Sequence, residues 1–199
     1  FSDGANLTSN YTSRNIASGY NGYISDFRIT KGSAVYSSNF VPQNKPLEAV
    51  KNTTLLVNGT SAGIYDSATT GNFETTGTAR LNTAVTKFAG ATSMYFDGSS
   101  TLITYKNTAL YGAPRQFTAE CWVYITNTGV TSGIMGCWDS SAGNAGWAIW
   151  CTGTAFKLIF GSVSFNSTWE YNNLGSVAAN TWTHIAFVRT ENGANNVMR

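Results

Sequence analysis

The sequence predicts an all-β protein, a sandwich of two antiparallel sheets, and three observations support this. Apolar and polar residues alternate with a period of two in almost every apolar run, which is the pattern of strands that bury one face. No stretch keeps the period of an amphipathic helix for three turns. Turn-forming pairs such as Asn58-Gly59 and Asp97-Gly98 interrupt the chain at short intervals, as they do between the strands of a sandwich.

The first clear strand pattern covers Gly22–Gly32. Tyr23, Phe27 and Ile29 have the alternation to face a core, and Asp26 and Arg28 alternate with them. Because successive side chains of a strand point to opposite faces, this strand has one face for a core and one polar face. The same alternation predicts later strands at Ser93–Gly98, Phe117–Tyr124 and Trp182–Arg189. We therefore expect a core that contains Phe96, Phe117, Val123, Ile125, Ile185 and Phe187.

The region between these strands predicts a hairpin and three free thiols. If Gly133–Trp138 and Gly146–Cys151 pair around a loop, Cys137 faces about Trp147. Cys151 then lies four residues further along the strand, roughly 13 Å away. This separation exceeds the Cα distance of about 7 Å that a disulfide allows. We therefore expect Cys137 and Cys151 to remain unpaired, and Cys121 to be a small buried residue.

Two prolines, Pro42 and Pro46, mark the best boundary, because they favour an extended connector and do not fit a central strand. We expect residues 1–41 to be the C-terminal strands of one repeat, residues 42–52 to be a linker and residues 53–199 to be the N-terminal and central strands of the next repeat. The chain starts at Phe1 and not at Met, so we expect a fragment of a tandem array. We also expect residues 22–29 to pair into the sheet formed by residues 54–199, as in a circular permutation.

Four segments carry motifs of a known family: Ser93–Gly98, Phe117–Tyr124, Asn180–Ala186, and Gly22–Gly32 with Ala34-Val35-Tyr36. Through them the chain resembles the laminin-G-like, concanavalin A-like jelly-roll family, and most of all the tandem copies in tail and other virion proteins of bacteriophages. The resemblance implies a two-sheet antiparallel jelly-roll sandwich. It also implies display on a virion or cell surface, with neighbouring repeats of the same polypeptide as partners.

Composition narrows the class of function. Charged residues make up 11% of the chain, against about 25% in an average soluble domain, and Asn, Thr, Ser and Gly supply the polarity instead. This balance is common in extracellular and virion β proteins. The basic residues are scattered, so there is no stripe for nucleic acid. No run of twenty apolar residues occurs, so we expect no membrane insertion.

The acidic residues argue against catalysis. Glycan-cleaving enzymes that share this sandwich carry carboxylates spaced Glu-x-Asp-x-x-Glu, which places alternate acids on one face of a strand. No two of the 10 Asp and Glu residues here lie within four positions of each other. His184 has no acid or nucleophile in a triad pattern, and we expect a half-buried strand histidine that gives a hydrogen bond. The chain is therefore not expected to be an enzyme.

Two segments are candidates for glycan binding, because sugars place C–H patches on aromatic rings and hydroxyl groups on amides or carboxylates. The first is a Gly-rich hairpin tip with Trp138, Asp139 and Asn144. The second contains Trp169 and Tyr171. The alternative is that these aromatic residues fill the core, as aromatics at strand spacing commonly do.

The family resemblance further implies a structural calcium ion, for which Asp66 and Asp26 occupy the matching positions. Calcium needs six to eight oxygen ligands, and the remaining ligands are not evident. The alternative for Asp26 is an ion pair with Arg28, and the alternative for Asp66 is an Asx turn.

Taken together, the sequence favours a non-catalytic module that binds cell-surface or extracellular glycans and mediates adhesion. One alternative is a purely structural fibre or decoration module that has no ligand. The other is the accessory binding domain of a glycan-degrading enzyme.

Overall fold

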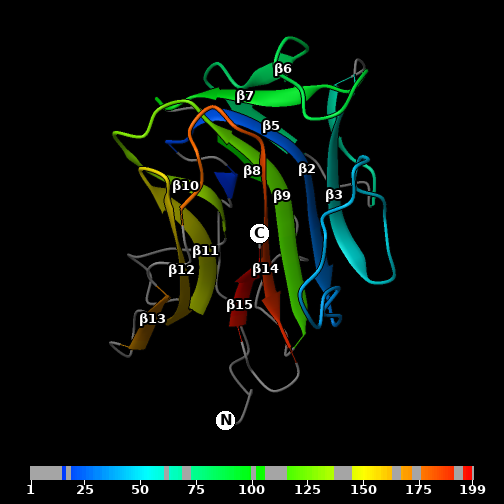
Figure 1. The fold of residues 1–199 in the computed structure, drawn as a ribbon, viewed down its shortest axis with the longest axis vertical. Helices are drawn as coiled ribbons and strands as arrows, with labels where there is room; N and C mark the ends of the chain where they lie inside the picture. Colours follow the sequence, from blue (N-terminus) through cyan, green and yellow to red (C-terminus); the bar gives the residue numbers. More distant parts are fainter. Residues whose placement is uncertain are drawn as a thin grey trace.

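Two antiparallel β-sheets packed face to face make up the structure, which is a computed structural model (Figure 1). It describes residues 15–16, 19–60, 63–68, 73–99, 102–105, 116–136, 145–162, 167–171, 176–190 and 195–198. Within these ranges the regular secondary structure consists of strands, and every strand pair is antiparallel. The all-β sandwich that the alternating sequence predicts is therefore confirmed.

The first sheet has seven strands, and those within residues 131–171 lie on the left in Figure 1. One end of it is a meander, in which Trp147 pairs with Phe160 and Gly136 pairs with Ala148. In spatial order its strands are β13 (Ser167–Tyr171), β12 (Ala155–Ser162), β11 (Ala145–Thr152), β10 (Thr131–Gly136), β1 (Asn15–Ile16), β8 (Leu102–Tyr105) and β5 (Phe73–Thr76).

The second sheet has eight strands. Its main path runs through β15 (Asn195–Met198), β14 (Thr183–Arg189), β9 (Phe117–Ile125), β2 (Asn21–Lys31), β3 (Thr53–Thr60) and β4 (Gly63–Asp66). Two further strands join it at one end, where β7 (Ser93–Asp97) pairs with both β2 and β6 (Arg80–Asn82).

The hydrophobic core lies between the two sheets. The six side chains that the sequence predicts for it are each 1% exposed or less, and Trp147 and Phe156 join them from the first sheet. Phe117 of β9 makes edge contacts with Trp147 of β11 and with Phe187 of β14. The period of two therefore identifies the inward face of each of these strands correctly.

The strand β2 lies in the middle of the second sheet. Ile24 pairs with Val123 of β9 on one side, and Phe27 pairs with Val57 of β3 on the other. The predicted pairing of residues 22–29 with the sheet of residues 54–199 is therefore confirmed. A bulge interrupts the β2–β9 ladder between Ser25 and Arg28. Asp26 lies within it in the left-handed region, with φ of 49°, which an aspartate tolerates better than most residues do.

The hairpin of β10 and β11 has the register that the sequence predicts, with Gly136 opposite Ala148. Cys137, the next residue, lies outside the described residues, so its pairing stays a prediction. Cys121 and Cys151 are free and buried. This agrees with the expectation that Cys151 is unpaired and that Cys121 is a small buried residue.

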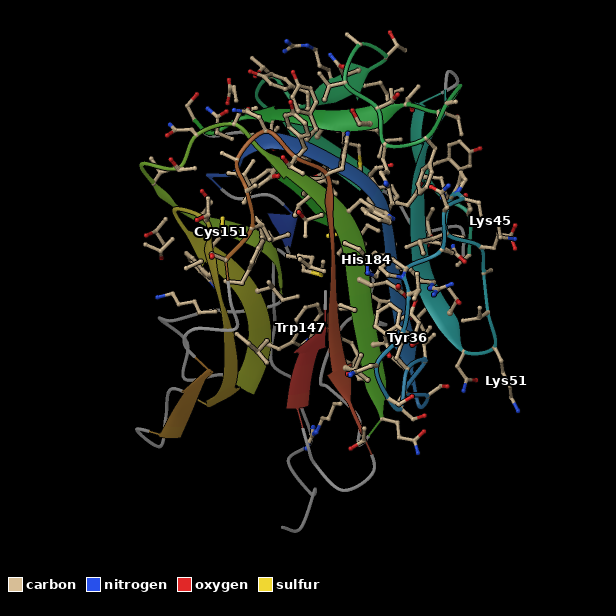
Figure 2. All side chains as sticks on the ribbon, viewed as in Figure 1. Tyr36, Lys45, Lys51, Trp147, Cys151 and His184 are labelled. Carbon is tan, nitrogen blue, oxygen red and sulfur yellow. The ribbon has the colours of Figure 1, made fainter. Side chains whose placement is uncertain are left out.

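The segment that joins β2 to β3, residues 32–52, carries both predicted linker prolines and forms no strand. It runs along the second sheet on the side away from the core (Figure 2). Leu47 is 2% exposed, and the side chain of Tyr36 points back toward the sheet. We call this segment the β2–β3 connection.

Candidate functional site

The outer face of the second sheet collects the polar and aromatic side chains that the strand alternation turns away from the core. On β9, Phe117 and every second residue after it are buried in the core, so Glu120, Trp122 and Tyr124 point outward. The β2–β3 connection covers one end of this face, and the other end is partly exposed. These two ends have different chemistry.

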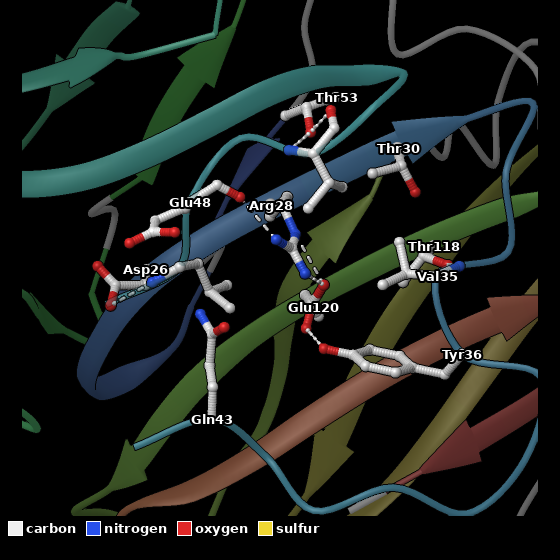
Figure 3. A network of polar contacts seen from close by, with 12 residues as sticks. Asp26, Arg28, Thr30, Val35, Tyr36, Gln43, Glu48, Thr53, Thr118 and Glu120 are labelled. Carbon is white, nitrogen blue, oxygen red and sulfur yellow. Dashed lines mark hydrogen bonds and ion pairs between the residues drawn. The ribbon is translucent and has the colours of Figure 1, made fainter. Parts of the chain in front are cut away.

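At the covered end, Arg28 of β2 and Glu120 of β9 form a buried ion pair (Figure 3). Nε of Arg28 donates to Oε1 of Glu120 at 2.9 Å, and Nη2 donates to the same oxygen at 2.5 Å. The remaining Nη1 group donates to the backbone carbonyl of Glu48 at 2.6 Å. The guanidinium therefore links two strands of the sheet to the β2–β3 connection.

The second carboxylate oxygen of Glu120 has two partners of its own. The hydroxyl group of Tyr36 donates to Oε2 at 2.7 Å, and Nε2 of His184 lies 3.1 Å from the same atom. Aromatic rings enclose His184, with Trp122 at a centroid distance of 5.1 Å and Phe40 at 5.8 Å. His184 is 3% exposed, so it is more deeply buried than the half-buried position that its strand pattern predicts.

These contacts determine the charge of Glu120. Burial alone would raise the pKa of its carboxyl group, but the hydrogen bond from His184, the charge of Arg28 and the hydrogen bond from Tyr36 together hold the pKa below its ordinary value. Burial and the neighbouring Glu120 raise the pKa of the Tyr36 hydroxyl group. A carboxylate kept ionised and enclosed in this way is suited to fixing the β2–β3 connection and not to protonating a leaving group.

At the exposed end, four aromatic rings form a row across neighbouring strands. Tyr23 of β2 is paired with Tyr95 of β7 on one side and with Tyr124 of β9 on the other. The ring centroids lie 5.1 Å and 5.6 Å from that of Tyr23, and Trp182, just before β14, lies 5.5 Å from Tyr124. All four side chains are partly exposed. We call these four residues the aromatic row.

A row of polar side chains runs beside the aromatic row, two residues further along the same strands. Nδ2 of Asn21 donates to the carbonyl oxygen of Asp97 at 2.8 Å, and the hydroxyl group of Thr126 donates to Oδ1 of Asn21 at 2.5 Å. The carboxylate of Asp97 accepts hydrogen bonds from the hydroxyl group of Thr78 and from the backbone N–H of Ser99. The exposed end therefore offers ring faces next to amide, hydroxyl and carboxylate groups.

The glycan-binding residues that the sequence suggests lie elsewhere. Trp138, Asp139 and Asn144 fall outside the described residues. Trp169 and Tyr171 belong to β13, an edge strand of the first sheet, and their side chains also fall outside the described residues. The structure therefore leaves these five as predictions, and it does not bring β13 next to the aromatic row.

The aromatic row escapes a reading that counts motifs, although its signal is present in the sequence. Tyr124 and Trp182 occupy the polar phase of their strands, where an aromatic residue is unexpected, whereas Tyr23 has the phase of Phe27 and Ile29, which predicts that it fills the core. The alternation turns Tyr124 and Trp182 outward, but the prediction that Tyr23 fills the core is wrong, because the bulge at Asp26 shifts the alternation of β2 and turns Tyr23 outward. Only the order of the strands, β7-β2-β9-β14, shows that the rings meet.

The two aspartates suggested for calcium have nitrogen donors as neighbours. Oδ1 of Asp26 accepts a hydrogen bond from Nδ2 of Asn58 at 2.9 Å, and Oδ2 accepts one from the backbone N–H of Leu47 at 3.3 Å. Burial raises the pKa of Asp26 against the effect of these two hydrogen bonds. The expected ion pair between Asp26 and Arg28 is wrong, because the bulge gives these residues different partners and Arg28 binds Glu120.

Asp66 forms the Asx turn that was the alternative for it, since its Oδ1 accepts the backbone N–H of Ala68 at 2.9 Å. The same oxygen also accepts the backbone N–H of Leu56 at 3.0 Å. In the described part of the chain no three His, Cys, Asp or Glu side chains come together as metal ligands. A calcium site needs converging oxygens, and the described surroundings of Asp26 and Asp66 supply N–H groups, so they do not fit the ion.

A comparison with protein families gives a match over residues 97–198, just over half of the chain, to the concanavalin A-like lectin/glucanases superfamily. Comparison with curated proteins and with solved structures gave no match. The described residues contain no helix of the length and hydrophobicity required to span a membrane.

Proposed function

The chain belongs to the concanavalin A-like lectin/glucanases superfamily, and we propose that it is a non-catalytic carbohydrate-binding module that mediates adhesion to glycans. Membership of this superfamily suggests a module of the carbohydrate-binding type. A fold alone does not give a function. The argument therefore rests on the outer face of the second sheet.

The observation that carries the proposal is the exposed aromatic row beside its polar row. The apolar C–H face of a sugar ring packs on an aromatic side chain, while its hydroxyl groups bind amides, hydroxyls and carboxylates. The four rings lie on neighbouring strands about 4.8 Å apart, so the row is about 14 Å long. A surface of this chemistry suits a short stretch of an extended glycan that crosses the strands.

The absence of catalysis is part of the proposal, and two observations support it. The acidic residues of the sequence lack the close spacing of a glycanase strand. Glu120, the carboxylate at the covered end, has four hydrogen-bond contacts and a depressed pKa. A general acid for glycoside cleavage needs a raised pKa and access to the substrate.

The setting that we propose is the exterior of a virion or cell, with other repeats of the same polypeptide as neighbours. The low content of charged residues and the resemblance to tandem virion modules support this setting. A glycan on the surface of a target cell would then be the ligand.

A purely structural module is the second candidate, and a specific observation favours it. Cross-strand aromatic pairs stabilise a sheet by roughly 0.2–1 kcal/mol each without any ligand, and each ring of the aromatic row contacts a neighbouring ring, Tyr23 and Tyr124 edge to face. The accessory binding domain of a glycan-degrading enzyme is the third candidate. It would use the same aromatic row, and the sequence that flanks this chain in its gene would identify it.

A glycan array with the purified protein separates the first candidate from the second, followed by calorimetric titration of any glycan retained. We expect Tyr124→Ala to weaken binding about tenfold, because Tyr124 contacts two rings of the row. Tyr65→Ala is the matched control, since Tyr65 is 45% exposed on the edge strand β4. Equal affinity of both variants would remove the aromatic row as the site, and no retained glycan would favour the structural module.

A further inference from the structure

Two cationic side chains flank the aromatic row, and each is held over an aromatic ring. The guanidinium carbon of Arg80, on β6, lies 4.3 Å from the centroid of Tyr95, at one end of the row. Nζ of Lys87 lies 4.0 Å from the ring of Trp122. Trp122 and Tyr124 point outward two residues apart on β9, so they are about 7 Å apart. Both cations therefore border the rings that we propose as the glycan site.

Hydrogen bonds in the connection between β6 and β7 hold the backbone that lies between the two cations. The side-chain oxygen of Asn82 accepts the backbone N–H groups of Ala84 and Val85, at 2.9 Å and 2.8 Å. The hydroxyl group of Ser93 donates to the carbonyl of Val85 at 2.6 Å. This turn begins two residues after Arg80 and ends two residues before Lys87. This ordered backbone and the ring contacts of the two side chains lower the entropy cost of binding a ligand.

Neither cation has a carboxylate partner in the described part of the chain. Apart from its ring contact, the guanidinium of Arg80 donates only to the carbonyl oxygen of Thr78, at 3.4 Å. The acid of the neighbouring polar row, Asp97, takes its hydrogen bonds from Thr78 and Ser99. By contrast, Lys45 at the β2–β3 connection pairs with Glu48 at 2.9 Å. The positive charge beside the aromatic row is therefore available to a ligand.

We infer that the glycan bound by the aromatic row is acidic and carries carboxylate or sulfate groups that Arg80 and Lys87 bind. This inference rests on the proposed function, since it names the class of ligand for the same site. The C–H surface of the sugars packs on the ring faces. The guanidinium N–H groups of Arg80 donate hydrogen bonds to an anionic group at the Tyr95 end of the row. Lys87 takes a second anionic group on the side opposite the polar row.

The test compares three oligosaccharides of similar length by calorimetric titration: a neutral 1,4-linked glucose hexamer, a galacturonic acid hexamer and a sulfated chondroitin hexamer. We expect at least one acidic hexamer to bind about tenfold more tightly than the neutral hexamer at about 0.1 M salt. The preference should largely disappear at about 1 M salt, where the Debye length falls to about 3 Å. The two acidic hexamers separate carboxylate from sulfate recognition.

The double variant Arg80→Gln/Lys87→Gln should lose this preference and keep its affinity for the neutral hexamer within about twofold. The matched control, Lys45→Gln/Lys51→Gln, removes the same charge from two exposed lysines of the β2–β3 connection (Figure 2). It should keep the preference. Thermal unfolding of both variants checks that each is folded.

Three outcomes would overturn the inference. Equal affinity for neutral and acidic hexamers would leave the carbohydrate-binding function in place and remove the acidic ligand. If the two double variants lose the preference for acidic hexamers equally, the preference comes from the net charge of the protein and not from Arg80 and Lys87. No binding of any glycan, on the array or in titration, would remove the proposed function and the inference together.

Discussion

The guanidinium of Arg28 and the carboxylate of Glu120 are 92 positions apart in the sequence and form a buried ion pair on the outer face of the second sheet, in which two N–H groups of Arg28 donate to one oxygen of Glu120. Glu120 also binds Tyr36 of the β2–β3 connection and His184 of β14. One carboxylate thus links three strands of the sheet to the segment that covers them. Breaking a buried pair leaves an uncompensated charge and costs about 3–5 kcal/mol.

The first prediction is that Glu120→Gln lowers the free energy of unfolding near neutral pH. The variant should also lose less of this free energy than the unchanged protein does when the pH is lowered. The pKa of Glu120 is lower in the folded protein than in the unfolded chain, so its contribution is present above the unfolded pKa of about 4.3 and disappears as the pH falls through the folded pKa. Urea unfolding of both proteins from pH 7 to pH 3 measures this. We expect a difference of about 3 kcal/mol at pH 7 that shrinks below about pH 5.

The pKa shift of Asp26 is opposite in sign to that of Glu120, so its contribution to the pH dependence of stability has to be separated from that of Glu120. Burial raises its pKa, so its contribution is present below the unfolded pKa and disappears as the pH rises through the folded pKa. Because both proteins contain Asp26, its contribution cancels in the difference between them. A difference that does not change between pH 7 and pH 3 would contradict the first prediction.

The second prediction concerns the hydrogen bond from Tyr36 to Glu120. Tyr36→Phe removes one donor to a buried carboxylate, and we expect it to cost about 1.5–3 kcal/mol. It should also speed proteolytic cleavage within residues 32–52, because this hydrogen bond helps to hold the segment on the sheet. Tyr65→Phe is the control, since Tyr65 is half-exposed on β4. Unchanged cleavage in Tyr36→Phe would show that other contacts hold the segment.

Sequence alternation was enough to predict the sandwich and the six core residues. The pairing of β2 with the later strands was predicted from the resemblance of residues 22–32 to the closing strand of the family. Alternation could not predict the pair Arg28–Glu120 or the aromatic row. The period of two places Arg28, Glu120 and Tyr124 on outward faces, but it gives Tyr23 the phase of the core residues. The outward position of Tyr23 depends on the bulge at Asp26, and the meeting of these side chains depends on the strand order. The same bulge explains why the local pairing of Asp26 with Arg28, two residues away, was wrong.

The third prediction tests how closely β2 approaches β9. Gly22 has φ of 150°, and an added Cβ atom would collide with the carbonyl oxygen of Tyr124. We expect Gly22→Ala to cost about 2 kcal/mol or more, from both backbone strain and overlap. Gly63→Ala separates these causes, because Gly63 has φ of 140° and nothing lies within 4 Å of the added atom. Chemical unfolding that gives equal costs for the two variants would show that the overlap contributes nothing.

The fourth prediction concerns the two described cysteines. Burial, together with the charge of Glu120, raises the pKa of Cys121 well above its ordinary value, and burial raises the pKa of Cys151 to about 11 in spite of hydrogen bonds from Ser132. We therefore expect neither thiol to react with a disulfide reagent at about pH 8 within the time that the unfolded protein reacts completely. Mass spectrometry of the labelled peptides checks each cysteine separately. Rapid labelling of Cys121 in the folded protein would contradict the burial of the β9 core face.

The last prediction separates structural from ligand-binding aromatics on one face of one sheet. Trp122 is 7% exposed and packs against Phe88 and His184, so Trp122→Ala should destabilise the protein by about 3 kcal/mol or more. Trp182 is partly exposed at the end of the aromatic row. Its replacement by Ala should cost less than about 1 kcal/mol and weaken glycan binding about fivefold to tenfold.

Chemical unfolding and glycan titration of both variants decide between these roles. Loss of a ring changes the stability if the aromatic row only supports the sheet, and it changes the glycan affinity if the row binds sugar. If the row serves only the sheet, Trp182→Ala loses stability in proportion to its ring contact with Tyr124, and any affinity for glycan is unchanged. If the row binds sugar, affinity falls while the free energy of unfolding hardly moves. A large stability loss in Trp182→Ala with no change in affinity would exclude the Trp182 end of the row as part of the glycan site.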